Sequence, residues 1–263
     1  MPPTKPLAAS AIIHRMGCIP STQMLAENRA AEILSQAIAP SAPSSEYLEA
    51  WLATEQASGV GQYDRHFISP PGGFYLSLLM MMDAAARMQL LPIAVAYHCA
   101  MSLRQAGAGE IHIRWPNDLC HSGKKIGGIL CRCLSSGNTN ALIIGIGINT
   151  NSSPNAFPVA LRPHIATLKE GGTRIDHEKI LEAIISGIHT LREPAAVENA
   201  VTAASAFDAL RGHRINVSFD GRNISGISWG WDAAGHLLVD AAGQMKLASG
   251  SISAVDGRPI RPA

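Results

Sequence analysis

The chain has 263 residues, a formal net charge of +1, and 16% charged against 47% hydrophobic residues. This length is sufficient for one large domain or for a medium domain with a small one, and the composition excludes a disordered chain. The balance of charge argues against a dedicated nucleic-acid binder, which usually carries a strong basic excess.

The sequence shows no sign of export or of a membrane span. No long apolar run follows the charge near the N-terminus, and the most apolar stretch, 72–82, is too short to cross a bilayer. The five cysteines form an odd set without CxxC spacing, which is typical of reduced packing residues. We therefore expect a cytoplasmic protein that has neither a membrane nor a nucleic acid as partner.

Strands and helices are predicted to alternate through the first 150 residues. A helix should begin at Pro20-Ser21-Thr22, where a hydroxyl can cap it, and run to about Ile38. Pro92 should open a second helix that continues to about Gln105. The long polar segment 57–71 is interpreted as a functional loop. Strands are predicted over 11–16, 47–54, 74–82, 111–115, 125–133 and 141–148, the last two joined by a hairpin turn at 135–138.

The second half of the chain has a different pattern. Isoleucine and leucine at helical spacing predict a helix over 176–191, and a second helix is expected over about 197–210. From Arg214 onward short apolar runs alternate with tight glycine turns, which is typical of a small β-barrel. The domain boundary is placed near 207–212.

Two kinds of motif stand out before any family is considered. Gly59-Val60-Gly61 and Gly145-Ile146-Gly147 both lack the third glycine of a dinucleotide-binding fingerprint, and no P-loop pattern is present. The segment 114–118 reads Arg-Trp-Pro-Asn-Asp, and Lys125 with two glycines follows soon after. These residues form either an ordinary Asx-turn or a pocket for a phosphate and a carboxylate.

Motifs in consistent order resemble one family over almost the whole chain. The most specific is Trp115-Pro116-Asn117-Asp118 followed by Lys125-Ile126-Gly127-Gly128. The others are Ser21-Thr22, Gln56 after a strand, Gly59-x-Gly61 with Arg65, Gly145-x-Gly147-x-Asn149, and Asp232-x-x-Gly235-x-Leu237. Together they resemble the biotin–protein ligases of the biotin/lipoyl ligase superfamily, without the N-terminal DNA-binding domain of its repressor-type members.

The resemblance implies a fold and a two-step acyl transfer. The fold is α/β of the α+β type: a mixed sheet packed on helices over residues 1–208, then an SH3-like β-barrel over 209–263. In the reaction, the carboxylate of biotin attacks the α-phosphate of ATP, supplied with Mg²⁺, to give biotinyl-5′-AMP. A lysine of the biotin carboxyl carrier domain of an acyl-CoA carboxylase then attacks the activated carbonyl. A homodimer joined at a sheet edge is a further possibility.

The resemblance also implies roles for individual residues. Lys125 is the fixed cation at the reacting phosphate, and Asp118 steers the incoming amine. No residue is expected to hold a metal of its own. The residues expected to bind biotin are Ser21, Thr22, Gln56, Gly59 and Gly128. The residues expected to bind the nucleotide are Gly61, Gln62, Arg65, Phe67, Asn117, Gly147 and Asn149. Taken alone, Ser21 and Thr22 are better explained as a helix cap.

The loop 59–67 departs from the pattern of the family. Val60 and Gln62 stand where the family usually has arginines, Asp64 replaces a glycine, and Phe67 replaces a tryptophan. Fewer bidentate donors should weaken the hold on a charged intermediate by a few kcal/mol.

Several hypotheses therefore stay open. The chain is a divergent ligase in which Arg65, Arg114 or Lys124 compensates, a ligase that releases its intermediate, or a paralogue that binds biotin without activating it. The hypothesis that the chain ligates lipoate or octanoate has less support, because an alkyl chain favours an apolar wall.

Overall fold

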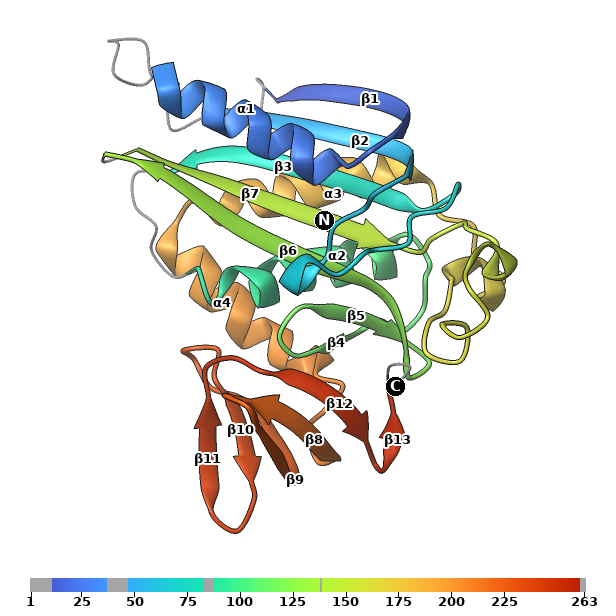
Figure 1. Ribbon diagram of the computed structural model, residues 1–263, viewed down its shortest axis with the longest axis vertical. Helices are drawn as coiled ribbons and strands as arrows, with labels where there is room; N and C mark the ends of the chain where they lie inside the picture. Colours follow the sequence, from blue (N-terminus) through green and yellow to red (C-terminus); the bar gives the residue numbers. More distant parts are fainter. Residues whose placement is uncertain (1–10, 37–46, 83–87, 138, 261–263) are drawn as a thin grey trace.

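The computed structural model describes residues 11–36, 47–82, 88–137 and 139–260, and its larger part is a seven-stranded sheet with helices on both faces (Figure 1). The strand order is β1-β2-β3-β7-β6-β5-β4. β1 and β2 are parallel and all other neighbours antiparallel, which confirms the predicted mixed sheet. The strands are β1 Ile12–Ile19, β2 Leu48–Gln56, β3 Phe74–Met82, β4 His112–Arg114, β5 Asp118–His121, β6 Lys124–Ser136 and β7 Thr139–Ile148.

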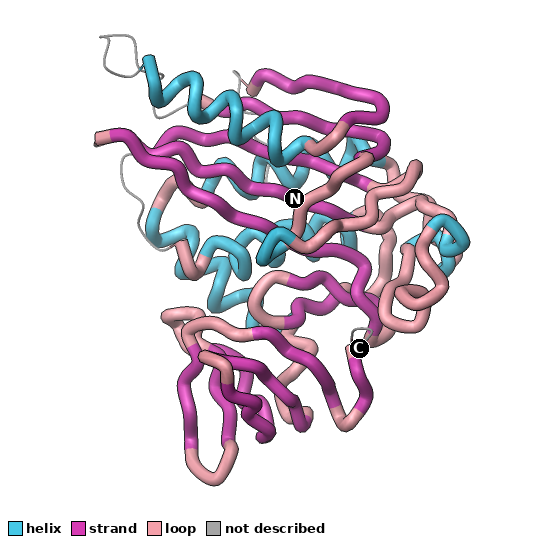
Figure 2. The backbone as a smooth tube through the Cα atoms, in the orientation of Figure 1, coloured by secondary structure: helices cyan, strands magenta, loops and turns pink. Residues whose placement is uncertain are grey.

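Helix α1, Thr22–Gln36, lies on one face of the sheet, and α2, α3 and α4 lie on the other (Figures 1 and 2). Ala26, Ala30 and Ile33 of α1 pack on β3 and β7, so the small alanine side chains bring this helix close to the strands. The main core fills the opposite face. The other helices are α2 Leu91–Gln105, α3 His177–Thr190 and α4 Pro194–Ala204.

Most predicted elements are present, but one predicted helix end was wrong and one strand was not predicted. The helix expected to run to residue 210 ends at Ala204, because the chain turns away to pair with β4, where the Ala209 amide donates to the Ile113 carbonyl at 2.9 Å. The short strand β5 was not predicted. Only three residues separate it from β4, so the two form a tight hairpin in which Arg114 pairs with Asp118. The last two residues of the predicted first helix lie outside the described residues.

A second, antiparallel sheet follows α4, and we call it the C-terminal sheet. It packs directly on the main domain, because the buried Trp115 indole donates to the Gly235 carbonyl at 2.9 Å. Apolar residues of both sheets belong to one continuous core. Its strands are β8 Arg214–Phe219, β9 Arg222–Trp231, β10 Leu237–Asp240, β11 Gln244–Leu247, β12 Ser251–Val255 and β13 Arg258–Pro259.

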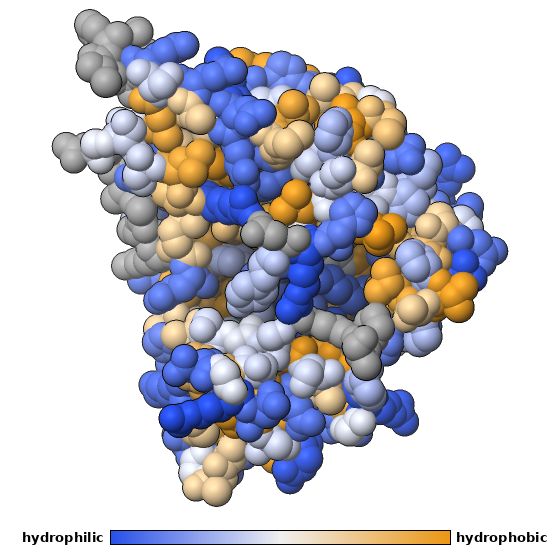
Figure 3. All heavy atoms as spheres, in the orientation of Figure 1, coloured by the Kyte–Doolittle hydropathy of each residue, from blue (hydrophilic) through white to orange (hydrophobic). Residues whose placement is uncertain are grey.

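The surface of the molecule is mixed in character (Figure 3). Hydrophilic side chains cover much of the C-terminal sheet on the side shown, and apolar side chains gather over the segment between β7 and α3. In the part of the chain that the structure describes, no helix is long and apolar enough to cross a membrane.

Candidate functional site

A pocket lies beyond the N-terminus of α1, over the strands at the middle of the main sheet, and we call it the inner pocket. Its floor is β3, β6 and β7, and its walls are the start of α1, the end of β2 and the loop 60–67. Gly147 on β7 has no room for a side chain, because a Cβ would lie 2.6 Å from the Phe67 ring. A bare strand therefore lets the aromatic ring close over the sheet.

Polar side chains at one end of the inner pocket form a connected network. Thr22 donates to Gln56 Oε1 from its amide at 2.8 Å and from its hydroxyl at 3.1 Å. Gln56 Nε2 donates to the Ser69 hydroxyl at 2.9 Å, and Ser77 Oγ donates to Thr22 Oγ1 at 2.9 Å. The network fixes these groups before a ligand arrives, so they can recognise a polar ring such as a urea with little loss of entropy.

Both interpretations of Ser21 and Thr22 have support in the geometry. The Met24 amide donates to Ser21 Oγ at 3.4 Å, as expected for a residue that caps a helix. Both residues also line the inner pocket. Gly59 does not line it. A Cβ at Gly59 would lie 2.4 Å from the Phe67 carbonyl oxygen. The absence of a side chain at Gly59 therefore lets the two ends of the loop 59–67 approach each other.

Asp118 sits at the other end of the inner pocket between two cations. Arg114 donates to Oδ2 from Nη2 at 2.9 Å and from Nε at 3.3 Å, and Lys125 Nζ lies 2.5 Å from Oδ1. Burial acts to raise the pKa of Asp118, but Lys125 and Arg114 outweigh it and hold this pKa below its usual range. Asp118 is therefore a charged acceptor at neutral pH, and it anchors the lysine in the pocket.

Asn117 and Gly128 complete this end of the inner pocket. Asn117 Nδ2 donates to the Ile129 carbonyl at 2.8 Å, which binds the β4–β5 turn to β6. A Cβ at Gly128 would lie 3.3 Å from Lys125 Nζ, so the glycine leaves the ammonium group accessible along the strand. The sequence motif around residues 114–128 thus brings an amide, a carboxylate and two cations to one point.

A second pocket of about 370 Å³ adjoins the inner one, and we call it the outer pocket. The two share Gly61, Gln62, Phe67 and Lys125, so Lys125 stands at their junction. Asn149 lies in the outer pocket with its Nδ2 weakly bonded to the Ala166 carbonyl at 3.4 Å. Its Oδ1 is buried and has no partner among the described residues, which leaves an acceptor ready for a ligand N–H group.

Residues that the sequence analysis missed form the far wall of the outer pocket. Phe157, Leu161 and Ile165 come from the segment between β7 and α3, and Ile260 comes from the C-terminal sheet. The four-residue spacing of 157, 161 and 165 was a signal of one apolar face. It was overlooked because glycine, proline and serine surround it. This apolar wall suits a flat heterocycle.

The loop between β2 and β3 carries little positive charge toward these pockets. Val60 and Gln62 line the inner pocket, and neither side chain is charged. Arg65 lines the outer pocket, and its guanidinium group lies 5.5 Å from the centre of the Tyr63 ring. The loop is ordered by a bridge between Val60 and His66 and by a 2.7 Å bond from the Gly61 amide to the Arg65 carbonyl. Within the described ranges, no three His, Cys, Asp or Glu side chains gather as metal ligands.

Comparison with known proteins shows which proteins this chain is similar to. Residues 38–149 match the model of the biotin/lipoate A/B protein ligase family, a match over somewhat less than half of the chain. The match includes the end of β2, the loop, both cations around Asp118, and Asn149. The resemblance inferred from the sequence motifs is thereby confirmed.

Two curated relatives and one solved structure are similar to this chain. The chain is 33% identical over 143 residues to a biotin–acetyl-CoA-carboxylase ligase of Paracoccus denitrificans, a match over 51% of this chain and 59% of that protein. It is 28% identical over 204 residues to the bifunctional ligase/repressor BirA of Escherichia coli, over 75% of this chain and 63% of that one. The chain thus spans about three fifths of the length of these relatives.

The solved structure is a biotin protein ligase of Aquifex aeolicus in complex with biotin and ATP. It superposes with a TM-score of 0.73 at 22% identity, over 92% of this chain and 97% of that one. At this level of identity the likeness establishes the fold, and it includes the C-terminal sheet.

Proposed function

We propose that the chain is an ATP-dependent ligase that activates biotin as biotinyl-5′-AMP and transfers it to a lysine of a biotin carboxyl carrier protein. One observation carries the proposal: Lys125 stands where a pocket lined with hydroxyl and amide side chains meets a pocket with an apolar wall and an unpaired acceptor. A carboxylic acid held in the first and a nucleotide held in the second meet at this cation. The family and the curated relatives support the same assignment.

The first step joins the carboxylate of biotin to the α-phosphate of ATP, and pyrophosphate leaves. Negative charge develops on the phosphate oxygens, and Lys125 stabilises it from a fixed position because Asp118 holds its ammonium group. Asn149 Oδ1 accepts a hydrogen bond from the nucleotide base, and Phe157 contacts the face of that base. Mg²⁺ supplied with ATP would neutralise the charge of the leaving phosphates.

In the second step the amine of the acceptor lysine attacks the activated carbonyl, and AMP leaves. The amine must arrive neutral and correctly oriented. Asp118 remains ionised at neutral pH and is a weak base. Its role is therefore to orient the amine by accepting a hydrogen bond from the N–H of that amine. Asn117 lies next to it and holds the adenylate at the same point.

Biotin-dependent exchange of pyrophosphate into ATP tests the first step, with lipoate and octanoate measured in parallel. We expect exchange with biotin alone. Lys125→Ala should abolish the exchange while calorimetry still detects biotin binding, because the hydrogen bonds that join Thr22, Gln56, Ser69 and Ser77 do not involve this cation. Unchanged exchange in this variant would exclude the proposed role of Lys125.

The loop supports a second candidate, a protein that binds biotin without activating it efficiently. Val60 and Gln62 supply no charge at the inner pocket, which favours weak retention of an anionic intermediate. Calorimetric binding of biotin combined with no exchange for any acid would establish this candidate in place of the ligase.

A further inference from the structure

Three segments that are distant in the sequence meet next to Asn149. They are the segment 150–152 after β7, the exit of the loop between β2 and β3 at 70–73, and the start of α3 at 175–177. The Asn151 amide donates to the Gly72 carbonyl at 2.8 Å. Gly72 has a φ of +91°, and a Cβ on it would lie 2.8 Å from the Asn151 carbonyl oxygen. The first two segments are therefore in direct backbone contact.

Thr150 is the fully buried centre of this meeting point. Its hydroxyl donates to the Gly72 carbonyl at 2.9 Å, and the same oxygen lies 2.7 Å from His177 Nε2. A hydroxyl has one hydrogen to donate, so a hydroxyl that donates to the carbonyl accepts from the imidazole N–H. Burial lowers the pKa of His177, and the ring is therefore neutral at neutral pH. A neutral imidazole thus completes the hydrogen bonds of a buried hydroxyl.

His177 reaches Thr150 from a fixed base. Asn151 Nδ2 donates to the Ile175 carbonyl at 2.8 Å, and Asn151 Oδ1 accepts from the Ile175 amide at 2.9 Å. His177 is the first residue of α3, and its ring packs edge-on against the buried Phe74 ring with 5.6 Å between the centroids. The imidazole is therefore held by the helix, by Asn151 and by an aromatic contact.

The buried acceptor of the outer pocket belongs to the residue directly before Thr150. The Asn149 amide donates to the Ile126 carbonyl at 2.6 Å, and the Asn149 carbonyl accepts from the Leu168 amide at 3.0 Å. Its side chain makes only the weak bond to Ala166, so the direction of Oδ1 depends on the backbone that carries it. The side chain of Thr150 is a further anchor of that backbone.

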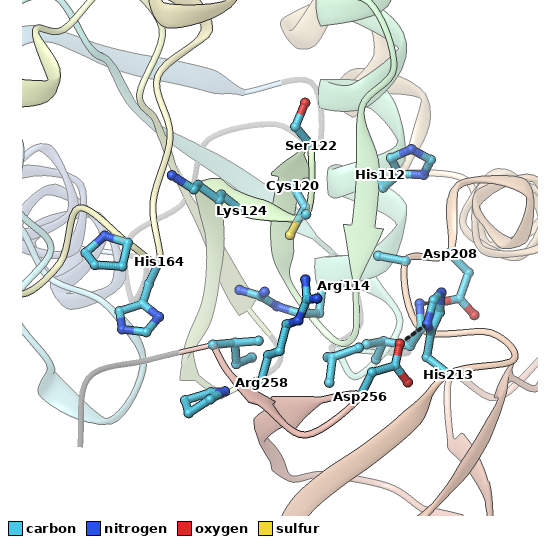
Figure 4. Close-up of a pocket in the computed structure, with 17 residues that line it drawn as sticks. His112, Arg114, Cys120, Ser122, Lys124, His164, Asp208, His213, Asp256 and Arg258 are labelled. Carbon is cyan, nitrogen blue, oxygen red and sulfur yellow. Dashed lines mark hydrogen bonds and ion pairs between the residues drawn. The ribbon is translucent and has the colours of Figure 1, made fainter.

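The outer pocket needs a fixed acceptor because it is not closed all round. Arg114, His164 and Ile260 line both this pocket and a cavity of about 730 Å³ between the main sheet and the C-terminal sheet (Figure 4). A ligand can shift toward that cavity unless contacts within the outer pocket hold it. The position of Asn149 Oδ1 therefore bears directly on how well a nucleoside is bound.

We propose that His177 is a positioning residue for the nucleotide: through Thr150 it fixes the backbone that directs Asn149 Oδ1 toward the base. This inference rests on the proposed function, in which Asn149 accepts a hydrogen bond from that base. Neither His177 nor Thr150 lines the inner or the outer pocket, so neither contacts a ligand held there.

Calorimetry of the full chain with AMP, ATP and biotin, each alone, measures this role without turnover. His177→Leu keeps an apolar side chain against Phe74 but removes the hydrogen bond to Thr150. We expect it to weaken AMP and ATP about tenfold, because a buried hydroxyl loses a partner and the backbone beside it must be ordered on binding. Biotin should bind as it does to the wild type. His177→Gln places an amide near the position of Nε2 and should restore nucleotide binding.

Two further variants test the path through Thr150. Thr150→Val removes the hydroxyl with little change of shape, and combining it with His177→Leu should weaken AMP no more than either change alone, since both remove the same bond. His189→Leu is the matched control, because His189 lies at the other end of α3 and lines none of the pockets described. It should bind nucleotides like the wild type, and circular dichroism should show every variant folded.

Three results would overturn the proposal. The first is wild-type AMP affinity in His177→Leu. The second is an equal loss of AMP and biotin in that variant, since His177 would then support the fold as a whole. The third is additive losses in the double variant, because His177 would then act by a path that does not include Thr150.

The outcomes also separate this inference from the proposed function. AMP binding that depends on His177, in a chain without biotin-dependent exchange, keeps the positioning role and removes the ligase. If exchange occurs, His177→Leu should raise KM for ATP and leave kcat unchanged. Exchange with the same KM for ATP in the wild type and in His177→Leu keeps the ligase and removes the positioning role.

Discussion

The ion pair between Arg114 and Asp118 should be worth far more than any ion pair on the surface. Their side chains are 4% and 5% exposed, and Arg114→Met would leave the buried Oδ2 without both of its donors. Removing one partner of a buried pair costs about 3–5 kcal/mol. Lys125 still reaches Oδ1 and is 30% exposed, so we expect the lower end, about 3 kcal/mol of unfolding free energy.

Urea denaturation followed by circular dichroism measures this loss, which corresponds to a midpoint shift of about 1 M for a slope of about 3 kcal/mol/M. A double-mutant cycle with Asp118→Asn isolates the pair, and we expect a coupling energy of about 2 kcal/mol. Arg15→Met is the matched control, because Arg15 and its partner Glu178 are both more than half exposed. The midpoint should hardly move in this control.

The effect of Arg114→Met should also depend on pH in a defined direction. The pKa of Asp118 in the folded wild type lies below 3.8, so its ionised form stabilises the fold above that pH and stops doing so as pH falls through the folded pKa. In the variant only Lys125 still pairs with the carboxylate, so the carboxyl group protonates at a higher pH than in the wild type. The difference in unfolding free energy should therefore be larger at about pH 7.5 than at about pH 4.5. Additive effects in the cycle, or a pH-independent difference, would refute the reasoning.

Three other predictions concern the loop, the junction of the sheets and a buried histidine. Gln62→Arg should slow dissociation of the adenylate, measured by filter retention; an unchanged or faster rate would show that the loop acts otherwise. Trp115→Phe should lower the unfolding free energy by about 1–2 kcal/mol, because it leaves the Gly235 carbonyl without its donor; a wild-type melting temperature would contradict this. Burial lowers the pKa of His98 to about 4 in the folded chain. Below pH 6.5 this imidazole therefore binds a proton in the unfolded chain but stays neutral in the folded chain until about pH 4. Stability should therefore fall by about 3 kcal/mol from pH 7 to 4, and His98→Gln should remove that slope; an equal slope in the variant would exclude His98 as the cause.

The fold could be predicted wherever one local signal was sufficient. The apolar run 74–82 became the strand β3, and the isoleucine spacing over 176–191 became α3 with Asp176 as its cap. The end of α4 could not be predicted, because residues 205–207 tighten into a 3₁₀ turn and Asp208 and Ala209 then pair with Ile113 of β4. Such long-range pairing leaves no mark in the local sequence.

The site could be predicted in part, for a similar reason. The motif containing Asp118 and Lys125 indicated a cluster of charges, and the structure places the two groups in contact. Arg114 was considered only as a cation that compensates for the loop, and its contact with Asp118 was not predicted, because the tight β4–β5 hairpin turns its side chain toward Asp118. Ile260 lies 135 residues beyond Lys125 and reaches the outer pocket through the packing of the two sheets, which sequence spacing does not reveal.

The continuous core shared by the two sheets bears on how the chain unfolds. Trp115 and the apolar side chains of β8 and β10 pack into the same interior as α2 and α4. Neither part has a complete interior of its own, so the loss of either would expose the buried apolar surface of the other to water. The whole chain should therefore melt in one cooperative transition, and a protease that cuts near residue 208 would release two fragments that no longer fold.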